Sequence, residues 1–431
     1  MVSNLSALKY RVKADDMTRH GAVMVAFGLG AAFFNYLYQL SMGWLLTPED
    51  YGVVISLMSL LIICSVFSRT VDTTVTRFVS REGGGLVRVG FLWHYFLRRT
   101  LLIGLATFIC LAALTPVLVS FLHLDSAWYP IILFSSLVLT FAVYTNLATL
   151  RGLQRFVPLG IGSTLWAFLR VAIAVGLVYA GFKASGALVS FLLAYAVVFF
   201  VTRYFLKDVS RAGGEEVEVA GLRSYTALSF VALFAFTVLV NADVVLARHF
   251  LSAAEAGTYS AISVMGKLVY FVPGGIAIAM FPKTASLTEG GGAHRAVLHR
   301  AMALTVLLSG AMVVAFWLFP DLVVGVLFMG KYPLAVPHLF RYGLAMALFA
   351  IASLLMFYLL SVNRTRVAYP LAGAMAIQVV LMALFHSSIE QVVDVVLISA
   401  ALALVMVGLF NVRQLMAAAG GAAAGGSHAG A

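Results

Sequence analysis

Residues 395–412 read VVLISAALALVMVGLFNV, eighteen residues without a charged side chain. A helix rises about 1.5 Å per residue, so about 20 apolar residues cross the ~30 Å hydrocarbon core of a bilayer. Comparable stretches recur along the whole chain, and together they predict an all-α, polytopic membrane protein with about twelve spans. The predicted spans are 21–46, 53–75, 100–122, 129–150, 157–181, 185–206, 225–247, 257–282, 301–319, 336–362, 367–386 and 391–412.

The composition supports this interpretation. Of 431 residues, 62% are hydrophobic and 10% are charged, whereas soluble proteins contain roughly 45–50% apolar and about 25% charged residues. The formal net charge of +11 would suggest a nucleic-acid partner in a soluble protein. Here the basic residues lie in short loops between apolar spans, which is the pattern that orients membrane proteins, so we expect no nucleic-acid partner.

The distribution of basic residues predicts the orientation of the spans. Of the 28 Lys and Arg residues, 21 lie at the N-terminus, after even-numbered spans or after the last span, and only Lys183, Arg248 and Lys331 lie in the opposite loops. Loops rich in Lys and Arg stay in the cytoplasm. We therefore expect a multi-pass protein of the cell (inner or plasma) membrane with both termini cytoplasmic.

The polar segment 207–224 lies at the middle of the chain and carries Glu215, Glu216 and Glu218. It predicts a cytoplasmic linker between two lobes of six helices, 21–206 and 225–413. A cytoplasmic segment, 1–20, precedes the first lobe. The end of the chain, 414–431, is rich in Ala and Gly, which predicts a disordered tail.

A short internal repeat supports two lobes. LTPEDYG at 46–52 follows the first span, and LSAAEAG at 251–257 follows the seventh, at an offset of 205 residues. Because each half has an even number of spans, the two repeats have the same orientation, related by an axis along the membrane normal.

Two basic residues lie near the middle of predicted spans, where a charge costs roughly 2.5–3.5 kcal/mol. Arg170 shares a helical face with Ser163 and Trp166, and Lys267 shares one with Ser260 and Ser263. Each is either a residue that binds a ligand or half of a structural ion pair.

Other polar residues of the spans leave similar alternatives open. Arg69 and Asp72 form either a functional stripe or an internal salt bridge, and Asp243 and Arg341 lie near the outer surface, where long side chains reach water easily. Amides within spans either line a cavity or bond helices together. The candidates for substrate binding are Arg69, Arg170, Lys267, Arg341, Asn35, Gln39 and Asn241, and the candidates for binding a coupling ion are Asp72 and Asp243.

Cations outnumber anions among these residues, which favours an anionic substrate such as a phosphate or pyrophosphate head group. Motifs of enzymes are missing: Gly266–Lys267 lacks the upstream glycine of a phosphate-binding loop, and Leu268 replaces its Ser or Thr. There is no HExxH, no GxSxG and no metal-type cysteine spacing, so we expect no enzyme activity, no cofactor and no metal. Cys64 and Cys110 lie in apolar runs as small hydrophobic residues.

Two longer segments carry a family resemblance. The stretch LLTPEDYGV at 45–53, which leads into the span ending TRFVSRE at 76–82, resembles the first two helices of polysaccharide transporters. NADVVLARHFL at 241–251, followed by EAGTY at 255–259, is similar to spans seven and eight of the same proteins. These transporters form the Wzx-like flippase branch of the multidrug/oligosaccharidyl-lipid/polysaccharide exporter superfamily.

The resemblance implies a MATE-like fold of two six-helix lobes around a cavity. It implies alternating access that moves a polyprenyl-pyrophosphate-linked glycan across the membrane, with membrane lipid, possible H⁺ or Na⁺ coupling, and possible polymerase or glycosyltransferase partners. Two alternatives remain: a cation-coupled multidrug or metabolite antiporter of the same superfamily, and a membrane scaffold for glycan assembly. Lipid II flippases of this superfamily usually carry two further helices, which this chain lacks.

Overall fold

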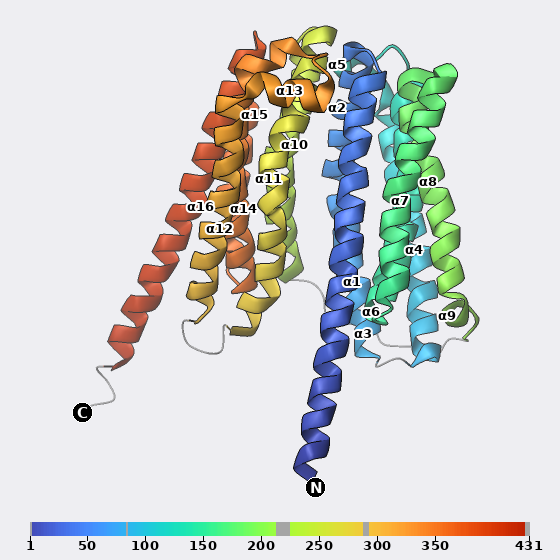
Figure 1. Ribbon diagram of the computed structural model, residues 1–431, viewed down its shortest axis with the longest axis vertical. Helices are drawn as coiled ribbons and strands as arrows, with labels where there is room; N and C mark the ends of the chain where they lie inside the picture. Colours follow the sequence, from blue (N-terminus) through green and yellow to red (C-terminus); the bar gives the residue numbers. More distant parts are fainter. Residues whose placement is uncertain (1, 83–84, 213–224, 288–292, 427–431) are drawn as a thin grey trace. The chain divides into compact units, whose positions relative to one another are not determined.

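The computed structural model describes residues 2–82, 85–212, 225–287 and 293–426, and Figure 1 shows them as a set of helices. The described part contains helices and no strand, which confirms the all-α prediction. Eleven described stretches are long and apolar enough to cross a membrane. One of them, Phe156–Phe205, holds two helices separated by positive backbone φ angles at Gly181 and Lys183. The eleven stretches therefore provide twelve spans.

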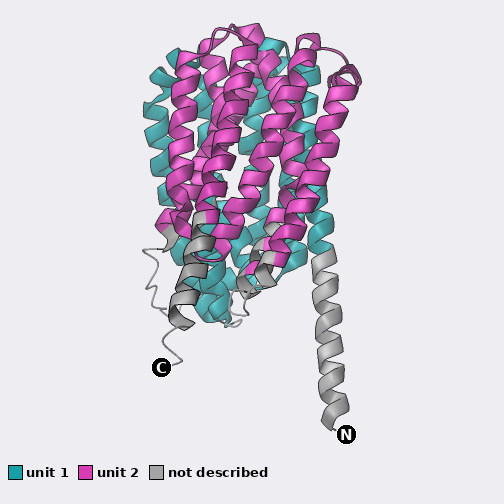
Figure 2. Cartoon of the chain, turned by 90° about the vertical axis from the view of Figure 1, so that its left-hand side faces the viewer, with its two compact units in different colours: residues 1–50, 67–220 teal, residues 51–66, 221–431 magenta. Residues whose placement is uncertain are grey.

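The chain divides into two compact units, coloured separately in Figure 2. Unit 1 comprises 1–50 and 67–220, and unit 2 comprises 51–66 and 221–431. The sequence predicts lobes that are continuous along the chain, whereas residues 51–66, the first part of the second span, group with unit 2. The predicted linker lies mostly outside the described residues.

Unit 1 is built on the first, third, fourth, fifth and sixth spans. Its helices α1 and α7 pack together, as do α4 with α6 and α8 with both α6 and α7. The helices are α1 (Val2–Leu45), α3 (Val66–Arg81), α4 (Leu86–Ala113), α5 (Thr115–Leu122), α6 (Trp128–Gly152), α7 (Phe156–Leu177), α8 (Lys183–Phe205) and α9 (Lys207–Arg211).

Unit 2 has α11 and α14 at its centre, and α14 also packs against α12 and α16. Helix α10 packs on α15. The helices are α2 (Pro48–Cys64), α10 (Tyr225–Phe250), α11 (Ala253–Leu287), α12 (Ala293–Leu318), α13 (Pro320–Phe328), α14 (Val336–Ser361), α15 (Ala368–Leu384) and α16 (Ile389–Gly426).

The third span of each half ends in the same way, which extends the internal repeat. Helix α5 opens with Pro116 in its first turn and ends at His123 with φ 49°, and α13 opens with Pro320 and ends at Met329 with φ 54°. Proline lacks the N–H that an interior helical position needs but fits a first turn. Pro320, directly after the ninth predicted span, therefore starts a new short helix.

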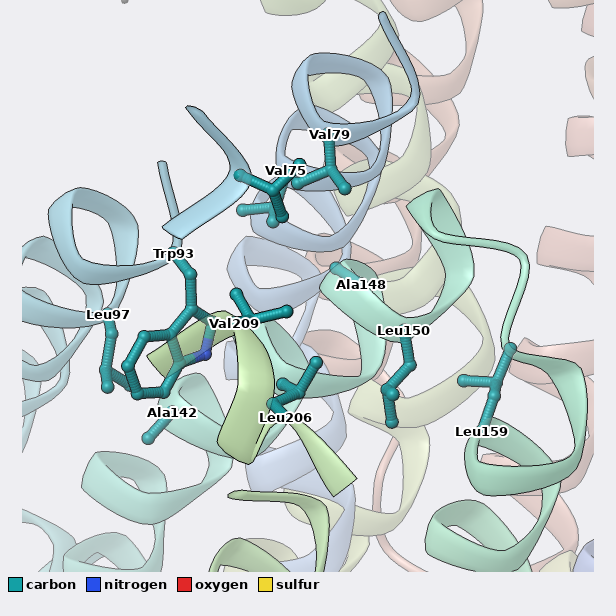
Figure 3. Close-up of a cluster of buried hydrophobic side chains, with 11 residues drawn as sticks. Val75, Val79, Trp93, Leu97, Ala142, Ala148, Leu150, Leu159, Leu206 and Val209 are labelled. Carbon is teal, nitrogen blue, oxygen red and sulfur yellow. The ribbon is translucent and has the colours of Figure 1, made fainter. Parts of the chain in front are cut away.

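Unit 1 contains a cluster of buried apolar side chains, drawn in Figure 3, and one of its members, Trp93, also begins a short chain of polar contacts. The indole N–H of Trp93 on α4 donates to the Asn146 side-chain oxygen on α6 at 2.9 Å, and the Asn146 amide donates to Thr202 on α8 at 3.0 Å. All three side chains are buried. Because lipid offers no hydrogen-bond partner, polar groups such as these bond helices to one another.

The contact between α2 and α11 in unit 2 joins the two copies of the repeat. Gly52 and Gly257 occupy equivalent positions of the repeat, and a Cβ atom placed on Gly52 would lie 3.1 Å from the Gly257 nitrogen and 3.3 Å from its Cα. Beside them, the buried ring of Tyr51 packs against Phe328 and Tyr332, with centroids 6.0 and 5.8 Å away. Only a residue without a side chain allows the two backbones to approach this closely.

Candidate functional site

Four charged side chains are buried in the part of the chain that the structure describes. Three are basic and one is acidic: Arg170, Arg248, Lys267 and Asp243. Isolated charges are costly in a membrane and mark functional positions. Each unit contains one polar cluster built on these residues, which we call the arginine cluster (unit 1) and the aspartate–lysine cluster (unit 2).

The arginine cluster consists of Arg170 and the side chains that enclose it. Arg170 lies on α7 and is only 3% exposed. Its guanidinium carbon lies 4.2 Å from the centroid of the Tyr38 ring on α1, 4.6 Å from Trp166 one turn earlier, and 4.8 Å from Phe191 on α8. Aromatic faces attract cations electrostatically, by up to about 2 kcal/mol when water is excluded. The rings therefore stabilise a charge that would otherwise be costly at this depth.

Asn35 is the hydrogen-bonding partner of Arg170. The Arg170 Nη2 donates to Asn35 Oδ1 at 2.8 Å, while the Asn35 amide donates to the Ala31 carbonyl oxygen at 2.8 Å. No carboxylate of the described residues forms an ion pair with Arg170, and its buried Nε has no hydrogen-bond partner. Among the described residues, the partners of Arg170 are therefore an amide and three aromatic rings.

The aspartate–lysine cluster is centred on Asp243 of α10, which is fully buried. Two tyrosine hydroxyls donate to the same carboxylate oxygen, Oδ2: Tyr259 on α11 at 2.9 Å and Tyr342 on α14 at 2.6 Å. The Tyr342 hydroxyl also lies 3.0 Å from that of Ser263. Three helices, α10, α11 and α14, therefore meet at this carboxylate.

Lys267 faces the other oxygen of Asp243 but does not bond to it closely. Its Nζ lies 3.9 Å from Asp243 Oδ1 and 3.4 Å from Asn241 Oδ1. The Asn241 amide donates to Thr237 at 2.9 Å. Asp243 Oδ1 is buried without a hydrogen-bond partner. The two side chains are therefore an ion pair at the 3.9 Å separation of a loose contact.

Two of the remaining candidates, Asp72 and Arg341, form ion pairs outside both clusters. Asp72 on α3 is paired with Arg151 at the end of α6. Arg341 donates to Glu390 at 2.8 Å and to Asp394 at 3.2 Å, and its side chain is 42% exposed. Gln39 is half-buried on α1, and Arg69 lies on α3 with its side chain outside the described part.

Sequence reasoning missed the tyrosines that hold Asp243. A signal existed for Tyr259, because positions 259, 263 and 267 follow one another at four-residue spacing on one helical face. For α14, the sequence analysis selected the charged residue Arg341 as the candidate. The neighbouring residue Tyr342, which points to a different side of the helix, is the one that contacts Asp243. Tyr38 and Phe191 carried no sequence signal as partners of Arg170.

Comparison with known proteins identifies relatives of this fold. Residues 41–337 match the model of a family described as polysaccharide biosynthesis protein. No curated protein sequence matches the chain significantly.

Three solved structures illustrate the likeness. An inward-facing multidrug resistance MATE family transporter of the MOP superfamily superposes with a TM-score of 0.73 at 14% identity, covering 89% of this chain and 95% of that one. The lipid II flippase MurJ, in an inward closed conformation, gives 0.67 at 16% identity, covering 90% and 87%. A MOP superfamily transporter from Pyrococcus furiosus gives 0.62 at 15% identity, covering 92% and 96%. The predicted MATE-like fold is confirmed.

Proposed function

Because this chain belongs to the polysaccharide biosynthesis protein family and shares its fold with MOP superfamily transporters, we propose that it is a flippase. Its substrate would be a lipid-linked oligosaccharide or polysaccharide precursor, moved across the membrane by alternating access. The lipid would remain in the bilayer while protein side chains hold the charged head group and the sugars.

The observation that carries this proposal is the sign of the buried charge. The described helices bury three basic side chains and one acidic side chain. Of these, Arg170 has no carboxylate partner and Lys267 is only loosely matched by Asp243. A polyprenyl pyrophosphate is anionic, and guanidinium and ammonium groups are its natural ligands. In this proposal Arg170 with Asn35 in unit 1, and Lys267 with Asn241 in unit 2, are two separate basic positions that favour an anionic head group.

The antiporter alternative requires an acidic site for a cation. Asp243 is the one buried carboxylate among the described side chains, and Lys267 Nζ lies 3.9 Å from it. An ammonium group at this distance repels a cationic drug. The scaffold alternative predicts no role for either cluster, yet burying such charges is costly.

Transbilayer movement in proteoliposomes tests the proposal. Purified protein is reconstituted with a fluorescently labelled polyprenyl-pyrophosphate oligosaccharide, and lipid in the outer leaflet is quantified by a membrane-impermeant quencher. We expect movement by the wild type and at least a tenfold slower rate for Arg170→Ala/Lys267→Ala. The matched control, Arg88→Gln, removes one positive charge from a half-exposed side chain. No movement by folded wild-type protein would refute the proposal.

Orientation belongs to the same proposal. We propose that the protein lies in the cell membrane with both termini cytoplasmic, since the Lys and Arg residues gather on that side of the spans. Single cysteines placed at 210 and at 125, labelled with an impermeant maleimide on intact cells, test this. Labelling of position 210 from outside would overturn it.

A further inference from the structure

We infer that one end of unit 1 carries a binding site for an anionic phospholipid, formed by α4, α8 and α9. Its cations, which we call the basic band, are exposed: Arg98 and Arg99 on α4, Arg203 on α8 and Lys207 on α9. The inference goes beyond the proposed function, because the ligand is a lipid of the surrounding bilayer and not the lipid-linked precursor. It applies equally to a flippase and to an antiporter.

The apolar cluster of unit 1 brings these cations to the same end of the unit. Trp93 and Leu97 of α4 share this cluster with Leu206 and Val209, which lie at the junction of α8 and α9 (Figure 3). Two cations of the basic band directly follow Leu97 in the sequence, and one directly follows Leu206. The guanidinium carbon of Arg203 lies 5.6 Å from the centroid of the Trp93 ring, so a cation of α8 contacts α4.

Aromatic rings hold three of the four cations in place. The guanidinium carbon of Arg99 lies 4.3 Å from the centroid of the Tyr95 ring, and the Nζ of Lys207 lies 4.8 Å from that of Tyr204. The contact of Arg203 with α4 is the third. A side chain that is already held against a ring loses less conformational freedom when it binds an anion, so less binding free energy is lost to ordering.

The acidic side chains closest to the basic band in the sequence have other partners. Asp208 forms an ion pair with Arg155, and Glu82 forms one with Arg88. Within the described residues, no ion pair joins an acid to any of the four cations. The basic band is therefore a surface of net positive charge, which attracts anions.

Two apolar stripes that continue from the basic band favour a lipid as the occupant. On α4, Leu102 and Ile109 lie four and eleven residues after the first cation, on the same helical face, and both are 58% exposed. On α8, the exposed Val197 and Phe200 precede Tyr204 by seven and four residues, again on one face. Exposed apolar side chains of a span contact acyl chains. A phospholipid fits both parts, with its phosphate at the cations and its chains along the stripes.

The orientation proposed above places this end of unit 1 at the cytoplasmic leaflet. Anionic lipids give that leaflet its negative surface potential, and clusters of Lys and Arg beside a span bind them. Each such cation strengthens binding by about fivefold.

Counting bound lipids by native mass spectrometry tests the inference. Purified full-length protein in a neutral detergent is titrated with dioleoylphosphatidylglycerol, which is anionic, or with dioleoylphosphatidylcholine, which is zwitterionic and has the same chains. The wild type is compared with Arg98→Gln/Arg99→Gln. The matched control, Arg364→Gln/Arg366→Gln, also removes two positive charges, but from the connection between α14 and α15 in unit 2.

We expect the wild type to bind phosphatidylglycerol about tenfold or more tightly than phosphatidylcholine. Arg98→Gln/Arg99→Gln should lose about tenfold or more of the affinity for phosphatidylglycerol, whereas the control should lose less than about threefold. Equal affinity of the wild type for the two lipids would overturn the inference. An equal loss in the two variants would also overturn it, because binding would then follow net charge and not the basic band.

Competition identifies the source of the bound anion. Inorganic pyrophosphate and farnesyl pyrophosphate, each at the concentration of the lipid, should not displace phosphatidylglycerol. Displacement by the first would indicate a site for a free anion, and displacement by the second alone would indicate a site for the transported precursor; either result would overturn the inference. If Arg98→Gln/Arg99→Gln does not fold, Arg203→Gln/Lys207→Gln removes the other two cations, and unchanged phosphatidylglycerol affinity in that folded variant would contradict the assignment.

Discussion

Replacing Gly52 by leucine should separate α2 from α11 at the point where the two repeats touch. An added Cβ would lie 3.1 Å from the Gly257 nitrogen, 3.3 Å from its Cα and 3.4 Å from the carbonyl carbon of Ala256. Atoms in ordinary contact keep about 3.5–4.0 Å apart. All three neighbours are backbone atoms, so none can move aside by a change of rotamer.

The distances give the size of the effect. The Cβ of an alanine at position 52 would lie about 0.1–0.9 Å closer to these backbone atoms than ordinary contact allows. Overpacking of this kind costs about 1–3 kcal/mol. Leucine adds three further carbons in the same direction. Moving α2 away from α11 then costs less free energy than compressing the contact between them. Because 1.4 kcal/mol changes an equilibrium tenfold, we expect the separated state to be populated at least tenfold more.

Ser56 reports this separation, since it lies one turn beyond Gly52 and is fully buried. In a background without Cys64 and Cys110, the rate at which an impermeant maleimide labels Ser56→Cys on intact cells should rise about tenfold or more with Gly52→Leu. Gly408→Leu is the matched control, because nothing lies within 4 Å of a Cβ at Gly408. Equal labelling rates for Gly52→Leu and the control would refute the reasoning.

Three further predictions follow from contacts outside this region. Asn146→Leu leaves the Trp93 N–H without its acceptor, and thermal unfolding in detergent should show a loss of about 1–3 kcal/mol, whereas the double variant with Trp93→Phe should recover part of it. Arg341→Gln should leave flipping near the wild-type rate in the proteoliposome assay, because Arg341 forms exposed ion pairs on unit 2; a tenfold loss would show that it contacts substrate. Arg155 lowers the pKa of Asp208 to about 2, below its usual ~3.9, so the pair stabilises the protein above pH ~4 and the effect disappears as pH falls toward 2. Since this pair is partly exposed, Asp208→Asn should cost under about 1 kcal/mol at pH 7 and nothing near pH 2, as measured by unfolding at both pH values.

The helices were predictable because hydrophobic length in lipid leaves few alternatives: without water, the backbone must satisfy its own hydrogen bonds. The buried cations Arg170 and Lys267 were predictable for a related reason. A charged residue near the middle of an apolar span, far from both membrane surfaces, is rare and easily recognised in the sequence. Their partners were harder to predict. Asp72 contacts Arg151, 79 residues away, and the rings around Arg170 come from three helices, so only tertiary packing reveals them.

The position of a residue along a predicted span also did not indicate which of two neighbours, Arg341 or Tyr342, contacts the buried Asp243. Both lie on the same turn of α14, but the first faces Glu390 and the second faces Asp243. A change of one residue rotates a side chain by 100° around a helix, and single-sequence hydropathy does not determine that rotation when both faces of the helix are apolar.

The contact of Gly52 with Gly257 has an evolutionary consequence. If the two halves descend from one duplicated segment, Gly52 and Gly257 descend from the same ancestral position. In the present protein, each of them forms part of the surface through which its repeat contacts the other repeat. Duplication normally lets two copies diverge independently, but here a side chain gained at Gly52 would push against the backbone at Gly257. Among the diverged repeats of this protein and its relatives, we expect these two sites to change together or not at all.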